Sequence, residues 1–274
     1  MAGSLDLERL ERRLERRLGQ AIGDFELIEP GDRILVGVSG GKDSWALLHL
    51  LRLLQRKAPV RFELLALNLD QGFTGFRVDL IEDYLAREGY AYEMRSARVN
   101  LTVKEKIQPG DTFCSLCARL RRGAIYKHAE QLGCNKIALG HHADDFVETL
   151  LLNQFFNGQI KAMHPRLRAR NGLHTVIRPL VYVWEDEVVE YARGMAFPVV
   201  CCACPGCKDP TLQRHRVKKL LRELERVHPG LKRSLLGALS RVDLASLPIP
   251  TRPGRRVGDR LPVLALAGEP NGDG

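Results

Sequence analysis

The stretch from Ile34 to Ser44 constrains the fold of this chain more than any other part of the sequence. Its first five residues, Ile34 to Val38, are mostly branched and apolar, which predicts a strand buried on both faces. A polar turn with two glycines follows, and leucines at helical spacing come after it, at positions 47, 48, 51 and 54. A strand, a glycine turn and a helix in this order aim backbone N–H groups and a positive helix end at one point, where an anion such as phosphate binds.

The turn itself, Ser39-Gly40-Gly41-Lys42-Asp43-Ser44, carries groups suited to a nucleotide phosphate. The glycines let the backbone approach closely, the serines offer hydroxyl donors, and Lys42 adds a positive charge. Asp43 beside phosphates makes sense mainly through Mg²⁺. We therefore predict that all six residues bind a nucleotide.

The common P-loop does not fit this turn, because it requires glycine at position 36 and Ser or Thr at position 43, where this chain has Val36 and Asp43. The string instead resembles the PP-loop of the ATP pyrophosphatases. That resemblance implies binding of ATP, cleavage between its α- and β-phosphates, and adenylation of a substrate oxygen.

Strand-like and helix-like segments alternate along most of the chain, which predicts an α/β fold with a doubly wound, mostly parallel sheet and helices on both faces. We expect a main domain over residues 29–228, an N-terminal helical arm over 1–28, and a C-terminal extension over 229–274 that is partly disordered. The apolar face of the first helix is expected to pack on the main domain, with an RNA-facing arm as the alternative. The strands are expected at 34–38, 62–69, 90–95, 136–139 and 176–180.

Polar residues also follow two other predicted strands. Gly140-His141-His142-Ala143-Asp144-Asp145 comes after the fourth strand, so it faces the same edge of the sheet as the PP-loop. We predict that Gly140, His141 and Asp145 contact the nucleotide or its metal, although an aspartate here also suits a helix N-cap. Asp70, at the end of the second strand, is expected either to contact the nucleotide or to form a turn.

Seven cysteines suggest a metal or catalysis rather than disulfides, because their number is odd and no signal peptide is evident. Cys114 and Cys117 form one C-x-x-C pair and Cys204 and Cys207 another. Such pairs could hold zinc through four thiolates, or an iron–sulfur cluster. A cluster on three protein ligands would leave one iron open to carry an extra sulfur atom.

Basic residues follow both pairs, and the net charge is +9, which suits nucleic acid as a polyanionic partner. The first pair is followed by Arg119, Arg121 and Arg122, and the second by Arg214, Arg216, Lys218 and Lys219. No run of eighteen apolar residues exists, so no membrane span is predicted and the expected location is the cytoplasm.

Together these motifs resemble the TtcA family, the tRNA 2-thiocytidine synthetases. The match includes the PP-loop, the run Cys114-Ser115-Leu116-Cys117-Ala118-Arg119-Leu120-Arg121-Arg122-Gly123, the histidine–aspartate motif and Val176-Ile177-Arg178-Pro179-Leu180. The resemblance implies ATP-dependent thiolation of a cytidine in the tRNA anticodon loop, with Mg²⁺, a [4Fe-4S] cluster and often a homodimer. A cysteine desulfurase or another sulfur donor would supply the sulfur.

The resemblance assigns the cluster to Cys114, Cys117 and a third ligand, which is Cys207 when the two C-x-x-C pairs are matched. Matching from Phe197-Pro198 leaves Cys204 open instead. Lys42 and Asp43 are then catalytic together with the three cysteines. This interpretation requires the PP-loop and both cysteine pairs to converge on one pocket.

Two alternatives remain. One is another PP-loop tRNA thiolase, which would make 2-thiouridine. The other is a zinc-bound RNA-binding protein without catalytic activity, which would be colourless and would not cleave ATP.

Overall fold

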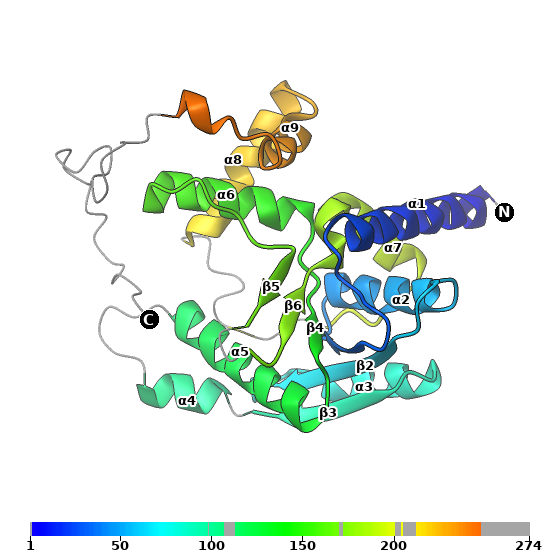
Figure 1. Ribbon diagram of the computed structural model, residues 1–274. Helices are drawn as coiled ribbons and strands as arrows, with labels where there is room; N and C mark the ends of the chain where they lie inside the picture. The colour runs from blue at the N-terminus through cyan, green and yellow to red at the C-terminus, as the bar shows by residue number, and fades with distance from the viewer. Residues whose placement is uncertain are drawn as a thin grey trace.

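The computed structural model describes residues 2–97, 99–106, 113–169, 172–200, 204 and 212–247. Within them a single sheet lies between layers of helices (Figure 1). The strands are β1 (Arg33–Gly37), β2 (Glu63–Asp70), β3 (Tyr92–Ser96), β4 (Lys136–Ala138), β5 (Arg166–Arg168) and β6 (Thr175–Ile177). The helices are α1 (Ala2–Asp24), α2 (Lys42–Gln55), α3 (Val78–Arg87), α4 (Val99–Lys106), α5 (Phe113–Gln131), α6 (Ala143–Asn157), α7 (Glu185–Gly194), α8 (Gln213–Val227) and α9 (Leu231–Ala238), with 3₁₀ turns η1 (Pro179–Tyr182) and η3 (Leu244–Ser246).

The order of the strands fixes where a ligand binds. It is β3-β2-β1-β4-β6-β5, and every pair is parallel except β5 with β6. The chain moves from β1 to β2 on one side, and β4 lies on the other side of β1, so the sheet reverses its winding between β1 and β4. In open α/β sheets, ligands bind outside the carboxyl ends of the strands at such a reversal. The loops after β1 and β4 therefore face each other at the expected site.

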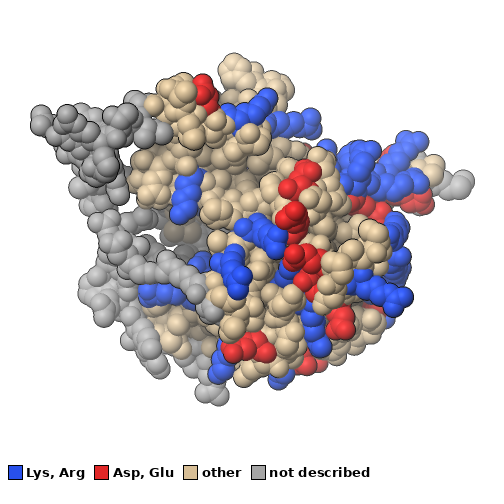
Figure 2. All heavy atoms as spheres, viewed as in Figure 1, with Lys and Arg blue, Asp and Glu red and all other residues tan. Residues whose placement is uncertain are grey.

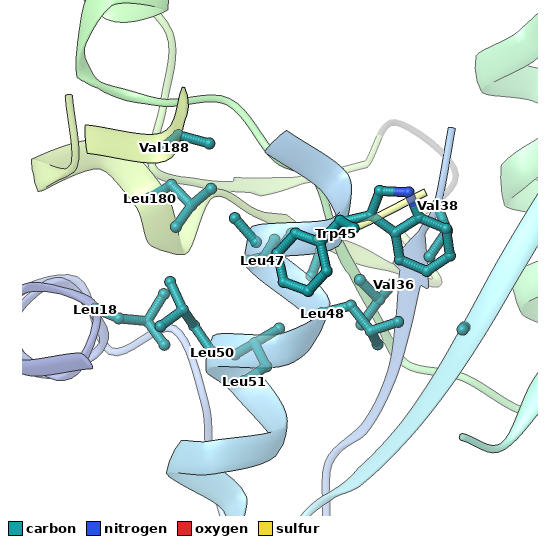
Figure 3. Packing of buried hydrophobic residues seen from close by; sticks show 14 of the residues in the cluster. Leu18, Val36, Val38, Trp45, Leu47, Leu48, Leu50, Leu51, Leu180 and Val188 are labelled. Atoms are coloured by element: carbon teal, nitrogen blue, oxygen red, sulfur yellow. The ribbon is translucent and has the colours of Figure 1, made fainter. Parts of the chain in front are cut away.

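Helix α2 holds the loop after β1 in place, because it is buried along most of its length. Trp45, Leu47, Leu48, Leu50 and Leu51 are all at most 1% exposed (Figure 3). The indole N–H of Trp45 also donates to the carbonyl of Pro198, at 3.1 Å. A rigid helix whose first turn meets the phosphate site is thus anchored deep in the core.

Helix α1 packs on α2, α7 and η1 through Leu10, Leu14 and Leu18. The prediction that its apolar face packs on the main domain is confirmed, although Leu5 at its start is exposed. The opposite face is rich in arginine, and Figure 2 shows these basic side chains gathered at the end of the molecule that bears the N-terminus. The division of the chain into three parts stays a prediction.

The α/β architecture is confirmed, and several boundaries differ from those expected. A sixth strand, β5, lies outside the five expected strands. Its three residues are all exposed, so no apolar alternation marks it. The strand expected at 176–180 ends at Ile177, and Pro179 starts η1. Helix α5 begins at Phe113, so the first C-x-x-C pair lies inside the helix.

Helix α9 lies within the segment expected to be an extension, and it packs on α6 and α8. The tail beyond Pro248, which was expected to be disordered, lies outside the described residues. None of the helices in the part of the chain that the structure describes is long and apolar enough to span a membrane.

Candidate active site

The PP-loop is held in shape by Ser44. Its Oγ donates to the carbonyl of Gly41 at 2.8 Å and accepts the backbone N–H of Ser39 at 3.2 Å. Gly40 adopts a φ of +81°, which favours glycine, and Gly41 caps helix α2. The first N–H groups of a helix lack partners within it, so they can bind an anion here.

The loop after β4 lies directly against the PP-loop. A Cβ on Gly140 would lie 2.9 Å from the carbonyl carbon and oxygen of Asp43 and 3.1 Å from the nitrogen of Ser44. Only glycine therefore allows this contact between two backbones. Gly140, predicted as a nucleotide contact, has a packing role in this structure, and any contact with the nucleotide stays a prediction.

His142 and Asp145 begin helix α6 beside the same point. The carboxylate of Asp145 accepts the N–H of His142 at 3.0 Å, so it caps the helix as one of the two predicted roles requires. His142 is 4% exposed; its Nε2 lies 3.7 Å from Asp43, and its buried Nδ1 has no hydrogen-bond partner among the described atoms. This nitrogen lies 3.5 Å from the carboxylate of Asp145 and 3.8 Å from that of Asp144, while the other ring nitrogen is directed toward the PP-loop.

A carboxylate that was not predicted joins the site from α7. Glu185 lies 3.3 Å from the Nζ of Lys42 and 2.6 Å from the Nζ of Lys218 on α8. Lys42 also pairs with its neighbour Asp43 at 2.9 Å. Glu185 begins a helix, where glutamate is usually favourable for electrostatic reasons alone, so the sequence carries no signal for this role.

These groups surround a cavity of about 220 Å³. It is lined by Lys42, Asp43, His142, Asp145, Glu148, Glu185, Arg214, His215 and Lys218. A second cavity of about 570 Å³ shares Glu148, Glu185 and Lys218 with the first and extends outward between α7 and α8. Two of the predicted nucleotide-binding elements thus line a single cavity with the basic helix α8.

Burial and charge tune the titration of these groups. Burial disfavours the ionised form of Glu185, but the hydrogen bond and charge of Lys218 and the charge of Lys42 outweigh it and lower its pKa to about 2. Burial likewise opposes the charge of Lys42, yet Asp43 and Glu185 raise its pKa. Burial raises the pKa of Glu148 to about 7, and Arg214 only partly offsets it. Lys42 and Glu185 therefore stay charged at pH 7 beside a carboxyl poised near neutrality.

His141 lies among arginines from three elements. The Nε of Arg178, which follows β6, donates to its Nδ1 at 3.3 Å. Burial and the charges of Arg178, Arg214 and Arg121 lower the pKa of His141 to about 4, so its ring is neutral at pH 7. The predicted basic residues of α5 and α8 therefore act on one point next to the PP-loop.

Asp70 lies at the end of β2, as expected, and its carboxylate accepts the N–H of Gly72 at 2.8 Å. It thus forms the turn that was one of its two expected roles, while contact with a nucleotide stays a prediction. The thiol of Cys117 donates to Gln71, the next residue, at 3.5 Å. Cys117 therefore lies at the edge of the sheet where β2 ends.

Residues on either side of the second cysteine group contact the site. The N–H of Val200 donates to the carbonyl of Gly40 at 2.9 Å, directly before the group. Arg214, seven residues after Cys207, pairs with Asp145 at 3.2 Å. Cys204 is half-buried; Cys207 and the side chain of Cys114 lie outside the described residues.

In the part of the chain that is described, no three His, Cys, Asp or Glu side chains are close enough to hold a metal ion unaided. Mg²⁺ does not require such a cage, because it is commonly held by one or two carboxylates and the phosphates of the substrate. Asp43 and Asp145 line the cavity and could serve as those carboxylates.

Comparisons with known proteins agree with this geometry. The family model of the PP-loop domain matches residues 10–219. The tRNA-cytidine(32) 2-sulfurtransferase of Geobacter metallireducens is 55% identical over 235 residues, which are 86% of this chain and 91% of that protein. The protein of the same name from Geobacter sulfurreducens is 56% identical over 231 residues, 84% of this chain and 90% of that protein.

Among solved structures, the U34-tRNA thiolase NcsA from Methanococcus maripaludis, with its [4Fe-4S] cluster, superposes with a TM-score of 0.70. The two sequences are 24% identical, and the match covers 85% of this chain and 80% of that one. At this identity the likeness establishes a common fold.

Proposed function

This chain belongs to the PP-loop domain family and, within it, to the tRNA-cytidine(32) 2-sulfurtransferases, and from this premise we propose that it uses ATP to replace the C2 oxygen of a tRNA cytidine with sulfur. The observation that carries the proposal is the junction at Gly40. There the PP-loop contacts the chain entering the second cysteine group through Val200, and at Asp43 it contacts the loop after β4 through Gly140. The reaction needs such a junction, because the activated oxygen and the incoming sulfur must reach the same carbon atom of the cytidine.

The first step is adenylation. The C2 oxygen of cytidine attacks the α-phosphorus of ATP, and the bond to the β-phosphate oxygen breaks, so that pyrophosphate leaves. Lys42 and the N–H groups at the start of α2 stabilise the negative charge that develops on the phosphates. Asp43 and Asp145 would hold Mg²⁺ against the same phosphates.

The second step exchanges oxygen for sulfur. A sulfur nucleophile attacks C2, and the C2–O bond breaks, so the original oxygen leaves as part of AMP. We propose that a [4Fe-4S] cluster on Cys114, Cys117 and either Cys207 or Cys204 supplies the sulfur when it is bound. The soft thiolates suit such a cluster, and the contact of Cys117 with Gln71 at the end of β2 and of Val200 with Gly40 supports it.

The tRNA would approach along the arginines around His141. Arg121, Arg178 and Arg214 come from three separate elements, and their charges all lower the pKa of His141, as expected where a phosphate backbone is bound. A cytidine turned out of the anticodon loop could then reach the adenylation site. A homodimer, a cysteine desulfurase or other sulfur donor, and a cytoplasmic location remain predictions that rest on the family resemblance or on the sequence.

The alternative of a 2-thiouridine enzyme is less favoured, because the relatives at over 50% identity are named for cytidine. The two are separated by nucleoside analysis of tRNA from a strain that lacks this gene. Loss of 2-thiocytidine, restored by the wild-type gene, is expected. Loss of a thiouridine with 2-thiocytidine intact would contradict the proposal.

The zinc alternative is tested with purified protein and two cysteine variants. Anaerobic wild-type protein should be brown and contain about four irons per chain. Cys114→Ser should lose iron and thiolation while still binding ATP. Cys134→Ser is the matched control, since Cys134 is buried in a separate apolar cluster beneath α5. A colourless wild-type protein with bound zinc and no ATP cleavage would overturn the proposal.

A further inference from the structure

Two lysines from distant parts of the chain meet at one carboxylate beside the PP-loop. Lys42 begins α2, Lys218 lies in the first half of α8, and Glu185 begins α7. The Nζ atoms of Lys42 and Lys218 lie 3.3 Å and 2.6 Å from the oxygens of Glu185. All three side chains are between 21% and 30% exposed and line the cavity of about 220 Å³.

Glu185 is firmly placed. Its backbone N–H donates to the carboxylate of Asp144 at 2.7 Å, and Asp144 in turn pairs with Lys232 at 2.6 Å. The carboxylate thus stands at a fixed position between two ammonium groups. The position of this carboxylate shows that the two lysines can bind one anion together. A phosphate group can accept the same charge-assisted hydrogen bonds from them.

Two carboxylates pair with the two lysines, and Glu185 is the one that contacts both. Lys42 and Lys218 contribute two positive charges, and Asp43 and Glu185 contribute two negative ones. A polyphosphate that enters the cavity brings its own negative charge next to Glu185, so it must compete with Glu185 for both lysines. Repulsion between phosphate and carboxylate favours an exchange of partners.

We propose that Lys218 is a second lysine for the terminal phosphates of ATP, and that Glu185 takes their place between the two lysines when no nucleotide is bound. This inference rests on the proposed function in that its ligand is MgATP. The sequence motifs assign only Lys42 to the phosphates of the nucleotide. With Lys218 in the same role, α8 contributes to nucleotide binding as well as to the surface expected to face RNA. Glu185 acts as a positioning residue and contacts no reacting atom.

The two residues are expected to have opposite effects on affinity. Lys218→Ala removes a charge-assisted contact and should raise the Kd for MgATP roughly 10- to 100-fold. Glu185→Gln keeps the shape but removes the competing charge, so it should lower that Kd roughly three- to tenfold, because less of the protein is held in the self-paired state. If Lys218 and Glu185 only supported the fold, both substitutions would raise the Kd for MgATP.

The experiment is calorimetric titration of full-length wild type, Lys218→Ala, Lys218→Arg, Glu185→Gln and the control Lys127→Ala with MgATP and, separately, with inorganic pyrophosphate. Lys127 is an exposed lysine on α5, away from the cavity. Thermal unfolding of each variant checks that it is folded. Lys218→Arg keeps the charge, so its Kd should lie between those of wild type and Lys218→Ala, and it provides the test if the alanine variant is unfolded.

A wild-type Kd in both Lys218 variants would overturn the inference, and so would an increased Kd in Glu185→Gln. Either result would leave the proposed function intact, provided that wild type binds MgATP. Absence of MgATP binding by folded wild-type protein would instead refute the proposed function. Pyrophosphate should show the same order of affinities as MgATP if Lys218 contacts the terminal phosphates.

Discussion

Gly140→Ala tests the contact on which the nucleotide site depends. The added Cβ would lie 2.9 Å from two backbone atoms of Asp43 and 3.1 Å from the nitrogen of Ser44, where ordinary contacts begin at about 3.4 Å. These atoms belong to the first turn of α2, so no rotation of a side chain relieves the overlap. Either the loop after β4 or the start of α2 must move by several tenths of an ångström.

The expected cost is that of overpacking a core, about 1–3 kcal/mol. Each kcal/mol corresponds to a decrease in Tm of about 2–4 °C for a protein of this size. The movement also displaces the backbone N–H groups that face the phosphates, so the Kd for MgATP should rise by about tenfold or more. Both quantities are measured on the same preparation, by thermal unfolding and by calorimetric titration.

Gly123→Ala is the matched control. Gly123 lies inside α5, and a Cβ there meets no atom within 4 Å. Alanine is the better helix former, so this variant should be as stable as wild type or more stable by up to about 1 kcal/mol, with an unchanged Kd. If Gly140→Ala matched Gly123→Ala in both measurements, the close approach of the two loops would be refuted.

Three further predictions concern buried charges. Lys136→Met should lower the free energy of unfolding by about 3–5 kcal/mol in denaturant titration, because Asp32, 2.7 Å away and buried, loses its cation; an effect below 1 kcal/mol would contradict this. Lys232→Met should be destabilising by about 1–3 kcal/mol, since buried Asp144 loses its ammonium partner, and an unchanged Tm would count against it. The pKa of Glu148 is raised to about 7, so between pH 4.5 and 7 the folded protein binds more protons than the unfolded chain, and its stability falls as pH rises through that range. Glu148→Gln should remove this pH dependence of the free energy of unfolding, which amounts to at most about 3 kcal/mol. An unaltered slope would show that Glu148 is ionised well below pH 7.

The PP-loop could be predicted because its signal is local. Ser39 to Ser44 are consecutive, and the strand before them and the helix after them have distinct periodicities. The loop after β4 could be assigned to the same edge because parallel strands share their direction. What the sequence could not show is how the two loops touch, and Gly140 proves to be needed for backbone contact.

Glu185 could not be identified in the same way. It lies 143 residues from Lys42 in the chain, and its neighbours form an ordinary helix start with three acidic residues in the first turn. Strand β5 could not be predicted for a different reason: all of its residues are exposed, so the sequence lacks the alternation of apolar and polar residues that marks a half-buried strand. The sequence also does not show that α5 includes the first C-x-x-C pair, because cysteine has no strong helix preference.

The charged contacts explain why the C-terminal helices belong to the site. Lys232 on α9 pairs with Asp144, whose other oxygen accepts the N–H of Glu185, and Glu185 binds the lysines of α8 and of the PP-loop. The two carboxylates in the middle, Asp144 and Glu185, are joined through the backbone N–H of Glu185, and each is paired with lysines on its outer side. A change at either end alters the charge felt at the other, since buried groups are poorly screened by solvent. Helix α9, which the sequence placed in an extension, thereby helps to hold Glu185 where the phosphates of ATP are expected to bind.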